Sequence, residues 1–198
     1  MKHTIKSYYY LAKPGIIYGN VLAAMAGFLF GSGRTFEGWR FLALVFGIGL
    51  VIGASCVLNN ILDRGIDKKM ARTKKRALVT GDITIPSAII YAVTLAGGGF
   101  SLLVLYTNWL TAALGAFAMV FYVVLYGIAK RKTIFGTLVG AVPGAIPPVT
   151  GYVAVSNQLD GAALLLFLIL VAWQMPHFYA ISIYRRHDYD AAAIPVWV

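Results

Sequence analysis

The sequence predicts an all-α membrane protein, a polytopic bundle of transmembrane helices. Hydrophobic residues make up 60% of its 198 positions and charged residues only 12%, with a mean hydropathy of +0.77. Those values lie outside the range of ordinary soluble domains. The lysines and arginines fall in short connections between apolar stretches, so the formal charge of +10 follows membrane topology. We therefore expect a lipid bilayer and no nucleic acid as partner.

Six apolar stretches are long enough to cross a bilayer core of ~30 Å, which takes roughly 20 helical residues. We expect one domain over residues 1–198, with no linker between the stretches. A cleaved signal peptide is a poor interpretation of the start, because Lys13-Pro14 precedes the first apolar run and no short run ends at a cleavage site. The expected spans are residues 14–33, 39–58, 86–106, 109–129, 135–155 and 161–183.

Fifteen of the seventeen cations fall on connections that emerge on one side of the membrane, and only Arg34 and Arg40 fall on the other. Loops rich in lysine and arginine stay in the cytoplasm, so this bias predicts a cytoplasmic N-terminus. It also brings residues 59–76 and residues 185–190 to the same face. The fifteen are Lys2, Lys6, Lys13, seven cations between Arg64 and Arg76, Lys130, Arg131, Lys132, Arg185 and Arg186.

Amides and carboxylates close the second apolar stretch, and a block of cations follows at once. Asn59, Asp63 and Asp67 are spaced by four residues, and Asn60 lies about 100° from Asn59, so the four share roughly one helical face. Such oxygen ligands suit Mg²⁺, which completes its coordination with water and phosphate oxygens. A diphosphate would fit there, with its oxygens bound by three of the cations that follow, Arg72, Lys75 and Arg76.

A simpler interpretation makes the same segment a topogenic loop, in which Asp63 and Asp67 pair with neighbouring cations. The adjacent amides of Asn59 and Asn60 favour a function, because buried amides are costly in lipid. Cys56 is the single cysteine and sits in an apolar run. Disulfides and cysteine metal sites within the chain are therefore excluded, and we expect Cys56 to serve packing.

The fifth stretch contains Pro143, Pro147 and Pro148, which we expect to break its backbone hydrogen-bond ladder. A broken helix at membrane depth is tolerated where protein or a wet cavity covers the freed backbone groups. The prolines therefore predict either a cavity lined by this stretch or a structural kink. The many glycines of the chain are explained by close packing of helices in lipid.

Four segments, in order, carry a resemblance to a known family. They are Asn-Asn-Ile-Leu-Asp-Arg-Gly-Ile-Asp (59–67), Gly-Ala-Ile-Pro-Pro-Val-Thr-Gly-Tyr (144–152), Trp-Gln-Met-Pro-His-Phe (173–178) and Asp-Tyr-Asp-Ala-Ala-Ala-Ile-Pro (188–195). Together they resemble the UbiA-type intramembrane prenyltransferases, and within them the enzymes that farnesylate heme. The resemblance runs from Tyr10 to the end of the chain.

The resemblance implies transfer of a farnesyl group from farnesyl diphosphate to a vinyl group of protoheme IX, giving heme O, with Mg²⁺ as cofactor. It implies an enzyme of the bacterial inner membrane with its active site on the cytoplasmic side. Proteins of heme A synthesis or of terminal oxidase assembly are the protein partners that it suggests. Heme would be a substrate here rather than a cofactor.

The resemblance also assigns roles to residues. Asp63, Asp67, Arg72 and Arg76 are the expected catalytic groups, and Asn59, Asp63, Asp67 and Asp188 are the expected metal ligands. Expected substrate contacts are Asn59, Asn60, Lys75, His177, Arg185 and Arg186.

Two departures and one open alternative accompany these roles. The wider family usually has aspartate at the position of Asn60, whereas the heme-type enzymes have asparagine there, as this chain does. Asp188 is followed four residues later by Ala192, so the second acidic motif lacks its usual partner, and Asp190 is a weak substitute. His177 is either a heme contact or a neutral histidine bonded to a carbonyl freed by Pro176.

Length is a further departure, since members of the family continue into spans beyond the sixth. We expect this chain to be truncated and to show weak activity or none by itself. Robust heme O formation by the 198-residue chain in proteoliposomes would refute that expectation.

Two rival functions stand beside heme farnesylation. A related prenyltransferase could use an aromatic acceptor such as 4-hydroxybenzoate, although residues 147–148 and 173–178 argue against it. Intramembrane amides and a broken helix also occur in small transporters, which are typically built from repeated halves with a site at the midplane. The sequence has no convincing internal repeat, and its acidic groups cluster at one membrane face.

Overall fold

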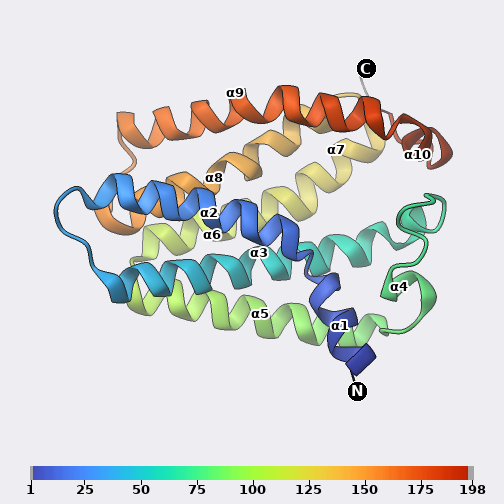
Figure 1. Ribbon diagram of the computed structural model, residues 1–198, viewed down its shortest axis with the longest axis horizontal. Helices are drawn as coiled ribbons and strands as arrows, with labels where there is room; N and C mark the ends of the chain where they lie inside the picture. Colours follow the sequence, from blue (N-terminus) through green and yellow to red (C-terminus); the bar gives the residue numbers. More distant parts are fainter. Residues whose placement is uncertain (1, 196–198) are drawn as a thin grey trace.

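Long helices run side by side along the bundle, and α1 and α10 lie at the same end of it (Figure 1). This computed structural model describes residues 2–195, with side chains from residue 5 onward. Met1, residues 196–198 and the side chains of residues 2–4 lie outside the described part, and Lys2 of the predicted basic face is among them.

Six helical segments are long and apolar enough to cross a membrane, which confirms the predicted number. Five of them end within three residues of the predicted boundaries, and the second, α3, is longer because its helix continues through the acidic motif. The elements are α1 (Lys2–Leu11), α2 (Pro14–Ser32), α3 (Gly38–Asp67), α4 (Ala77–Thr80), α5 (Ile85–Tyr106), α6 (Trp109–Val120), the π-helical η1 (Phe121–Tyr126), α7 (Gly127–Lys132), α8 (Gly136–Ser156), α9 (Gly161–Tyr184) and α10 (Arg186–Ala191).

Polar residues cap three of these helices at their N-termini. Thr84 accepts from the Ser87 amide at the start of α5, and Asn108 accepts from the Thr111 amide at the start of α6. Asp160 accepts from two amides in the first turn of α9. Each cap satisfies backbone donors that a helix leaves free at its beginning. The caps therefore fix where three of the spans begin.

Helix α3 lies at the centre of the packing, against α5 and α2, while α2 also packs closely on α8. Its apolar residues Leu44 and Ile48 meet Phe28, Leu103 and Ala154 in the principal core cluster. The close contact between α2 and α8 depends on glycine. A Cβ at Gly27 would overlap the Pro148 carbonyl, and one at Gly151 would overlap the Ala24 carbonyl. Small residues thus let these backbones approach, as in other membrane bundles.

The prolines interrupt the hydrogen-bond ladder of the fifth span, as predicted, but the helix is not broken, because α8 is continuous from Gly136 to Ser156. Its prolines remove donors without ending the helix. The Gly144 carbonyl is affected most, since the residues three and four positions later are Pro147 and Pro148. Packing against α2, α6 and α9 holds the helix together. The expected cavity beside it is present and is described below.

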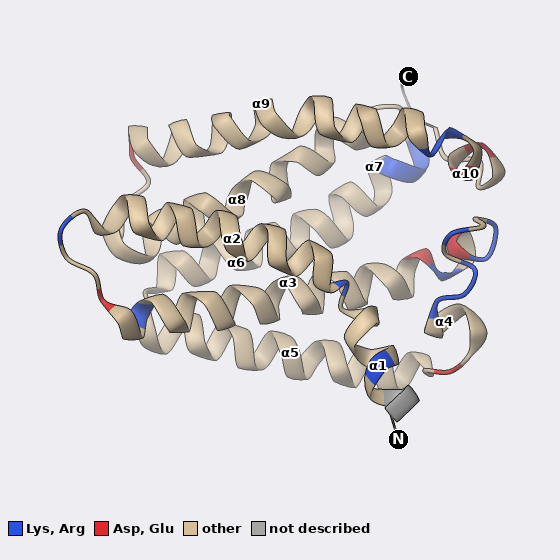
Figure 2. Ribbon diagram, viewed as in Figure 1, with Lys and Arg blue, Asp and Glu red and all other residues tan. Residues whose placement is uncertain are grey.

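The two ends of the bundle differ in charge. Figure 2 shows lysine and arginine gathered at the end where α4, α7 and α10 lie, whereas the opposite end carries few charges of either sign. This arrangement in space agrees with the cation bias of the sequence. It defines one basic end of the bundle, and the candidate site opens there.

Candidate functional site

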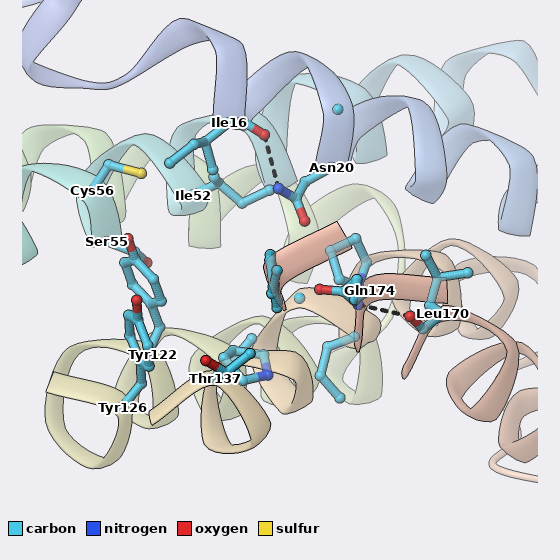
Figure 3. A pocket seen from close by; sticks show the side chains of 18 of the residues that line it. Ile16, Asn20, Ile52, Ser55, Cys56, Tyr122, Tyr126, Thr137, Leu170 and Gln174 are labelled. Carbon is cyan, nitrogen blue, oxygen red and sulfur yellow. Dashed lines mark hydrogen bonds between the residues drawn. The ribbon is translucent and has the colours of Figure 1, made fainter. Parts of the chain in front are cut away.

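A cavity of about 530 Å³ lies between α2, α3, α6, α8 and α9 (Figure 3). Lys130 and Tyr189 line it at the basic end of the bundle. Most of its lining is aliphatic or aromatic, from residues such as Ile52, Met119 and Phe178. Its size is that of an ordinary ligand pocket. We call it the first cavity. An apolar volume that ends among charges suits an amphiphilic ligand with an anionic head.

The acidic motif occupies the last three turns of α3 and is buried. Asn59 and Asn60 are each 2% exposed, Asp67 is 4% exposed and Asp63 is 7% exposed. The predicted shared face is therefore confirmed, and it turns into the protein. Buried carboxylates need partners, because an isolated charge in a low-dielectric interior is strongly unfavourable. The partners of these two aspartates define the site.

Two cations from the end of α7 pair with Asp63. From the sequence, these cations were expected only to orient the protein in the membrane. Lys130 Nζ pairs with Asp63 Oδ2 and donates to Asn59 Oδ1 at 2.9 Å. Arg131 contacts Asp63 Oδ1 at 2.8 Å, and Asn59 Nδ2 donates to Asp63 Oδ2 at 2.8 Å. Lys130 also lines the first cavity. The available sequence signal was three cations ending the fourth span on the face predicted to hold the motif.

Asp67 is paired with Arg76, one of the cations predicted from the sequence. The guanidinium donates to Asp67 at 2.7 Å and to Asn60 Oδ1 at 3.0 Å. Asn60 in turn donates to the Leu11 carbonyl at 2.8 Å, which ties the end of α1 to α3. The connection after α3 is therefore folded back onto the motif. Asp67 thus pairs with a cation of its own segment, as the simpler interpretation expected, whereas the partners of Asp63 come from α7. Lys130 lines the first cavity and Arg76 lines the second.

Arg72 and Lys75, predicted to contact phosphate oxygens, line a different cavity from Lys130. With Asn60 and Arg76 they line a second cavity of about 420 Å³, between α1 and the connection from α3 to α4. Of the predicted substrate contacts, Asn60 and Lys75 thus line the second cavity and His177 lines the first. The side chain of Lys6 completes the basic wall of the second cavity.

The candidates near the end of the chain lie on α9 and α10. His177 lines the first cavity and stacks on Trp173, with ring centroids 5.3 Å apart. Within residues 5–195 no hydrogen-bond partner is found for His177, so the alternative of a bond to a freed carbonyl is not realised there. Arg185 lies 4.8 Å from the Tyr184 ring, and Arg186 approaches Asp190 at 3.9 Å on the surface.

Oxygen ligands for a metal are present at Asn59 and Asp63, which adjoin each other. Over the described residues no three histidine, cysteine, aspartate or glutamate side chains meet in a metal-binding group, so Asp63, Asp67 and Asp188 do not form one together. Mg²⁺ commonly takes only one or two carboxylates and leaves other positions to phosphate oxygens. Arg131 Nε is buried and has no hydrogen-bond partner in the part of the chain described. The donor set therefore fits a metal bound together with an anion.

Lys13 brings a further cation to this region. It joins α1 to α2 in a left-handed backbone conformation, with φ of 56°. Burial lowers the pKa of Lys13 to about 8, while nearby Cys56 and Asp63 act in the opposite direction. Burial also raises the pKa of the Tyr189 hydroxyl, which lines the first cavity. Lys13 is thus held where an added anion would favour its charged form.

Two amides interrupt the apolar wall deeper in the first cavity. Gln174 is 5% exposed and donates to the Leu170 carbonyl at 3.1 Å, and Asn20 donates to the Ile16 carbonyl at 2.8 Å. Figure 3 shows both bonds as dashed lines, with the amide oxygens directed away from them. A Cβ at Gly144 would overlap Gln174 Oε1, so the glycine makes room for this amide.

Comparison with known proteins places this arrangement in a family. Residues 20–197 match the UbiA prenyltransferase family, and the chain belongs to it. Proteins named protoheme IX farnesyltransferase from Pectobacterium carotovorum and Sodalis glossinidius are each 48% identical over 97% of this chain. A protein named protoheme IX farnesyltransferase 2 from Pseudomonas aeruginosa is equally similar. The chain spans 65% of the length of these relatives.

Solved structures confirm the fold. A digeranylgeranylglyceryl phosphate synthase matches with a TM-score of 0.79 at 19% identity, covering 98% of this chain and 68% of that one. A UbiA homologue from Archaeoglobus fulgidus, bound to GPP and Mg²⁺, matches with a TM-score of 0.77 at 15% identity, covering 96% and 67%. The six candidate spans and the family together identify an integral membrane protein.

Proposed function

We propose that this chain forms the prenyl-donor site of an enzyme that transfers the farnesyl group of farnesyl diphosphate to a vinyl group of protoheme IX, giving heme O. The observation that carries the proposal is the junction of the apolar first cavity with the cluster of Asn59, Asp63, Lys130 and Arg131. That junction fits an isoprenoid chain joined to a diphosphate. Relatives that carry the name of this activity support the choice of donor and acceptor.

The diphosphate would lie at the inner cluster. Arg131 offers its unpartnered Nε, and Lys130 lies between the cavity and Asp63, so both can donate to phosphate oxygens. Asn59, Asp63 and Asp67 would hold Mg²⁺, in keeping with the GPP and Mg²⁺ bound to the homologue from A. fulgidus. When bound, the metal supplies positive charge that helps the diphosphate leave with the bonding electron pair. Arg76 supports Asp67 from the other side.

The residues of this chain then have defined tasks. Lys130 and Arg131 stabilise the negative charge that grows on the leaving oxygens as the C1–O bond breaks. The apolar wall of α3, α6 and α8 keeps water from the farnesyl cation until the vinyl π electrons form the new C–C bond. Water then adds to the resulting cation, and its proton is lost to the diphosphate. Asp188 stays a predicted metal ligand, whereas Arg72 and Lys75, which were predicted to contact the diphosphate, line the second cavity and not the first.

The acceptor would approach from the wall formed by α9. His177 and Trp173 face the first cavity there, and we propose that they contact the heme. Arg185 and Arg186 follow at the basic end, where they would meet the propionates. We place this end in the cytoplasm and the protein in a bacterial inner membrane, on the strength of the cation bias. Transfer of the product to heme A synthesis or to terminal oxidase assembly follows from the same proposal.

The test uses membranes that carry the full gene product. They are supplied with farnesyl diphosphate, Mg²⁺ and either protoheme IX or 4-hydroxybenzoate. The products are separated by chromatography and identified by mass spectrometry. We expect heme O from protoheme and no prenylated 4-hydroxybenzoate. Prenylation of the aromatic acceptor in place of heme would contradict the proposal, and so would the absence of any prenylated product.

A further inference from the structure

The second cavity is separate from the prenyl-donor site and has its own chemistry. Its walls come from α1, from the end of α3 and from the connection that leads into α4, and its volume is about 420 Å³. α1 lies at the basic end of the bundle, across the ends of α3 and α5 (Figure 1). The cavity therefore opens where the protein leaves the bilayer.

The charges around this cavity are unbalanced. Four cations, from Lys6, Arg72, Lys75 and Arg76, face one carboxylate, that of Asp82. Arg76 is engaged by Asp67, whereas Lys6, Arg72 and Lys75 form no ion pair with any residue in the described range. The Asp82 carboxylate already accepts from Thr80 at 2.8 Å. Several like charges around one hollow repel each other, and a bound anion would relieve that repulsion.

The exposed surface of α1 beside the cavity is aromatic and apolar, and its Tyr10 lines the cavity itself. Ile5 is 69% exposed and Tyr10 is 59% exposed, both on α1, and Lys6 lies over the Tyr10 ring at 6.0 Å. Tyr9 and Tyr18 are also exposed, and their hydroxyls are 2.7 Å apart, which ties the outer face of α1 to α2. Exposed tyrosines with adjacent lysines are typical of the headgroup region of a bilayer. A ligand here would be anionic at one end and apolar at the other.

We propose that the second cavity binds the phosphate of an anionic glycerophospholipid, with the acyl chains of the lipid lying beside α1. The phosphate accepts from Lys6, Arg72 and Lys75, while Ile5 and Tyr10 contact the glycerol and the upper acyl chain. Clusters of cations on an amphipathic helix or just outside a membrane span recognise anionic lipids in this way. Because Asn60 bonds to Leu11, a lipid on α1 also steadies the connection beside the acidic motif.

The experiment reconstitutes the purified chain in nanodiscs of phosphatidylcholine with increasing phosphatidylglycerol. Bound lipid is counted by native mass spectrometry after release from the disc, and thermal unfolding is followed in parallel. We expect retained phosphatidylglycerol and a higher Tm than in phosphatidylcholine alone. Equal retention of the two lipids would overturn the proposal.

Two variants that each remove one positive charge distinguish lipid binding in the second cavity from non-specific attraction of anionic lipids to the basic end of the bundle. Lys6→Gln should weaken phosphatidylglycerol retention about fivefold, the effect expected for one lysine near an anionic surface. Lys132→Gln removes an exposed cation at the same end of the bundle, outside the cavity, and should leave retention unchanged. Equal effects of the two variants would show general surface attraction and refute the site.

Soluble anions form the last arm. Inorganic phosphate and diphosphate are added to phosphatidylcholine nanodiscs at matched concentrations, and we expect neither to raise Tm through Lys6. A Tm rise with diphosphate that Lys6→Gln abolishes, without phosphatidylglycerol retention, would identify a soluble anion and overturn the lipid assignment. None of these measurements uses turnover, so their result is independent of the proposed farnesyl transfer.

Discussion

Single side chains decide the chemistry at the mouth of the first cavity, and Lys130 is the most informative of them. It contacts Asp63 and Asn59 from a helix that lies 67 residues further along the chain. The sequence placed these groups at one membrane face without showing that they touch. A contact between distant helices depends on how the spans pack, which periodicity and charge bias do not specify.

Replacement of Lys130 by methionine should lower turnover about a hundredfold, because one preorganised charge opposite the leaving group is lost. The measurement is the rate of heme O formation at saturating farnesyl diphosphate. Lys132→Met is the matched control, since Lys132 is exposed at the end of the same helix. Equal rates in the two variants would remove Lys130 from the site.

Lys13 gives a prediction about pH. Its folded pKa of about 8 lies below the ordinary lysine value of 10.5, so the unfolded chain binds more protons between those values. The free energy of unfolding should therefore rise with pH from about 8 to about 10.5 through this residue. Unfolding in detergent, compared between the parent and Lys13→Met, isolates the contribution. Identical pH slopes in the two proteins would contradict it.

Helices were easier to predict from the sequence than their contacts. Length and hydropathy located all six spans, and the four-residue spacing of Asn59, Asp63 and Asp67 predicted a shared face that the structure confirms. The prolines suggested a broken helix, but α8 is continuous because its packing against neighbouring helices compensates for the lost backbone hydrogen bonds. The short helix α1 was not predicted, and neither was the second cavity that it helps to form.

The contact between α2 and α8 yields a stability prediction. Gly27→Ala places a methyl group against the Pro148 carbonyl, and we expect it to lower the free energy of unfolding by ~1–3 kcal/mol. Gly97→Ala on α5 is the control, because a Cβ there meets no atom within 4 Å. That change should raise the free energy of unfolding by up to ~1 kcal/mol. Unfolding in detergent micelles reports both values.

At the scale of the whole molecule, charge asymmetry organises membrane orientation and function together. The end that carries most cations holds the acidic motif, the mouth of the first cavity and the second cavity. The sequence predicted this common face from loop charges alone. It did not predict that the basic residues divide between two cavities, since that division depends on how the connection after α3 folds back.

Orientation is tested by labelling with a membrane-impermeant maleimide in a Cys56→Ala background. Asp82→Cys lies at the basic end, and Gln158→Cys lies in the connection between α8 and α9. We expect intact cells to label Gln158→Cys, whereas Asp82→Cys reacts only after lysis. The reverse pattern would place the basic end outside the cell.

The most direct measurement of the central claim is diphosphate release from farnesyl diphosphate with Mg²⁺ and protoheme, compared between Asp63→Asn and Asp82→Asn in the full gene product. Both variants remove one carboxylate charge at the same end of the bundle, and only Asp63 contacts Lys130 and Arg131. The proposed site predicts that Asp63→Asn abolishes Mg²⁺-dependent release, with Asp82→Asn close to the parent. Full release by Asp63→Asn would contradict the site and the mechanism built on it.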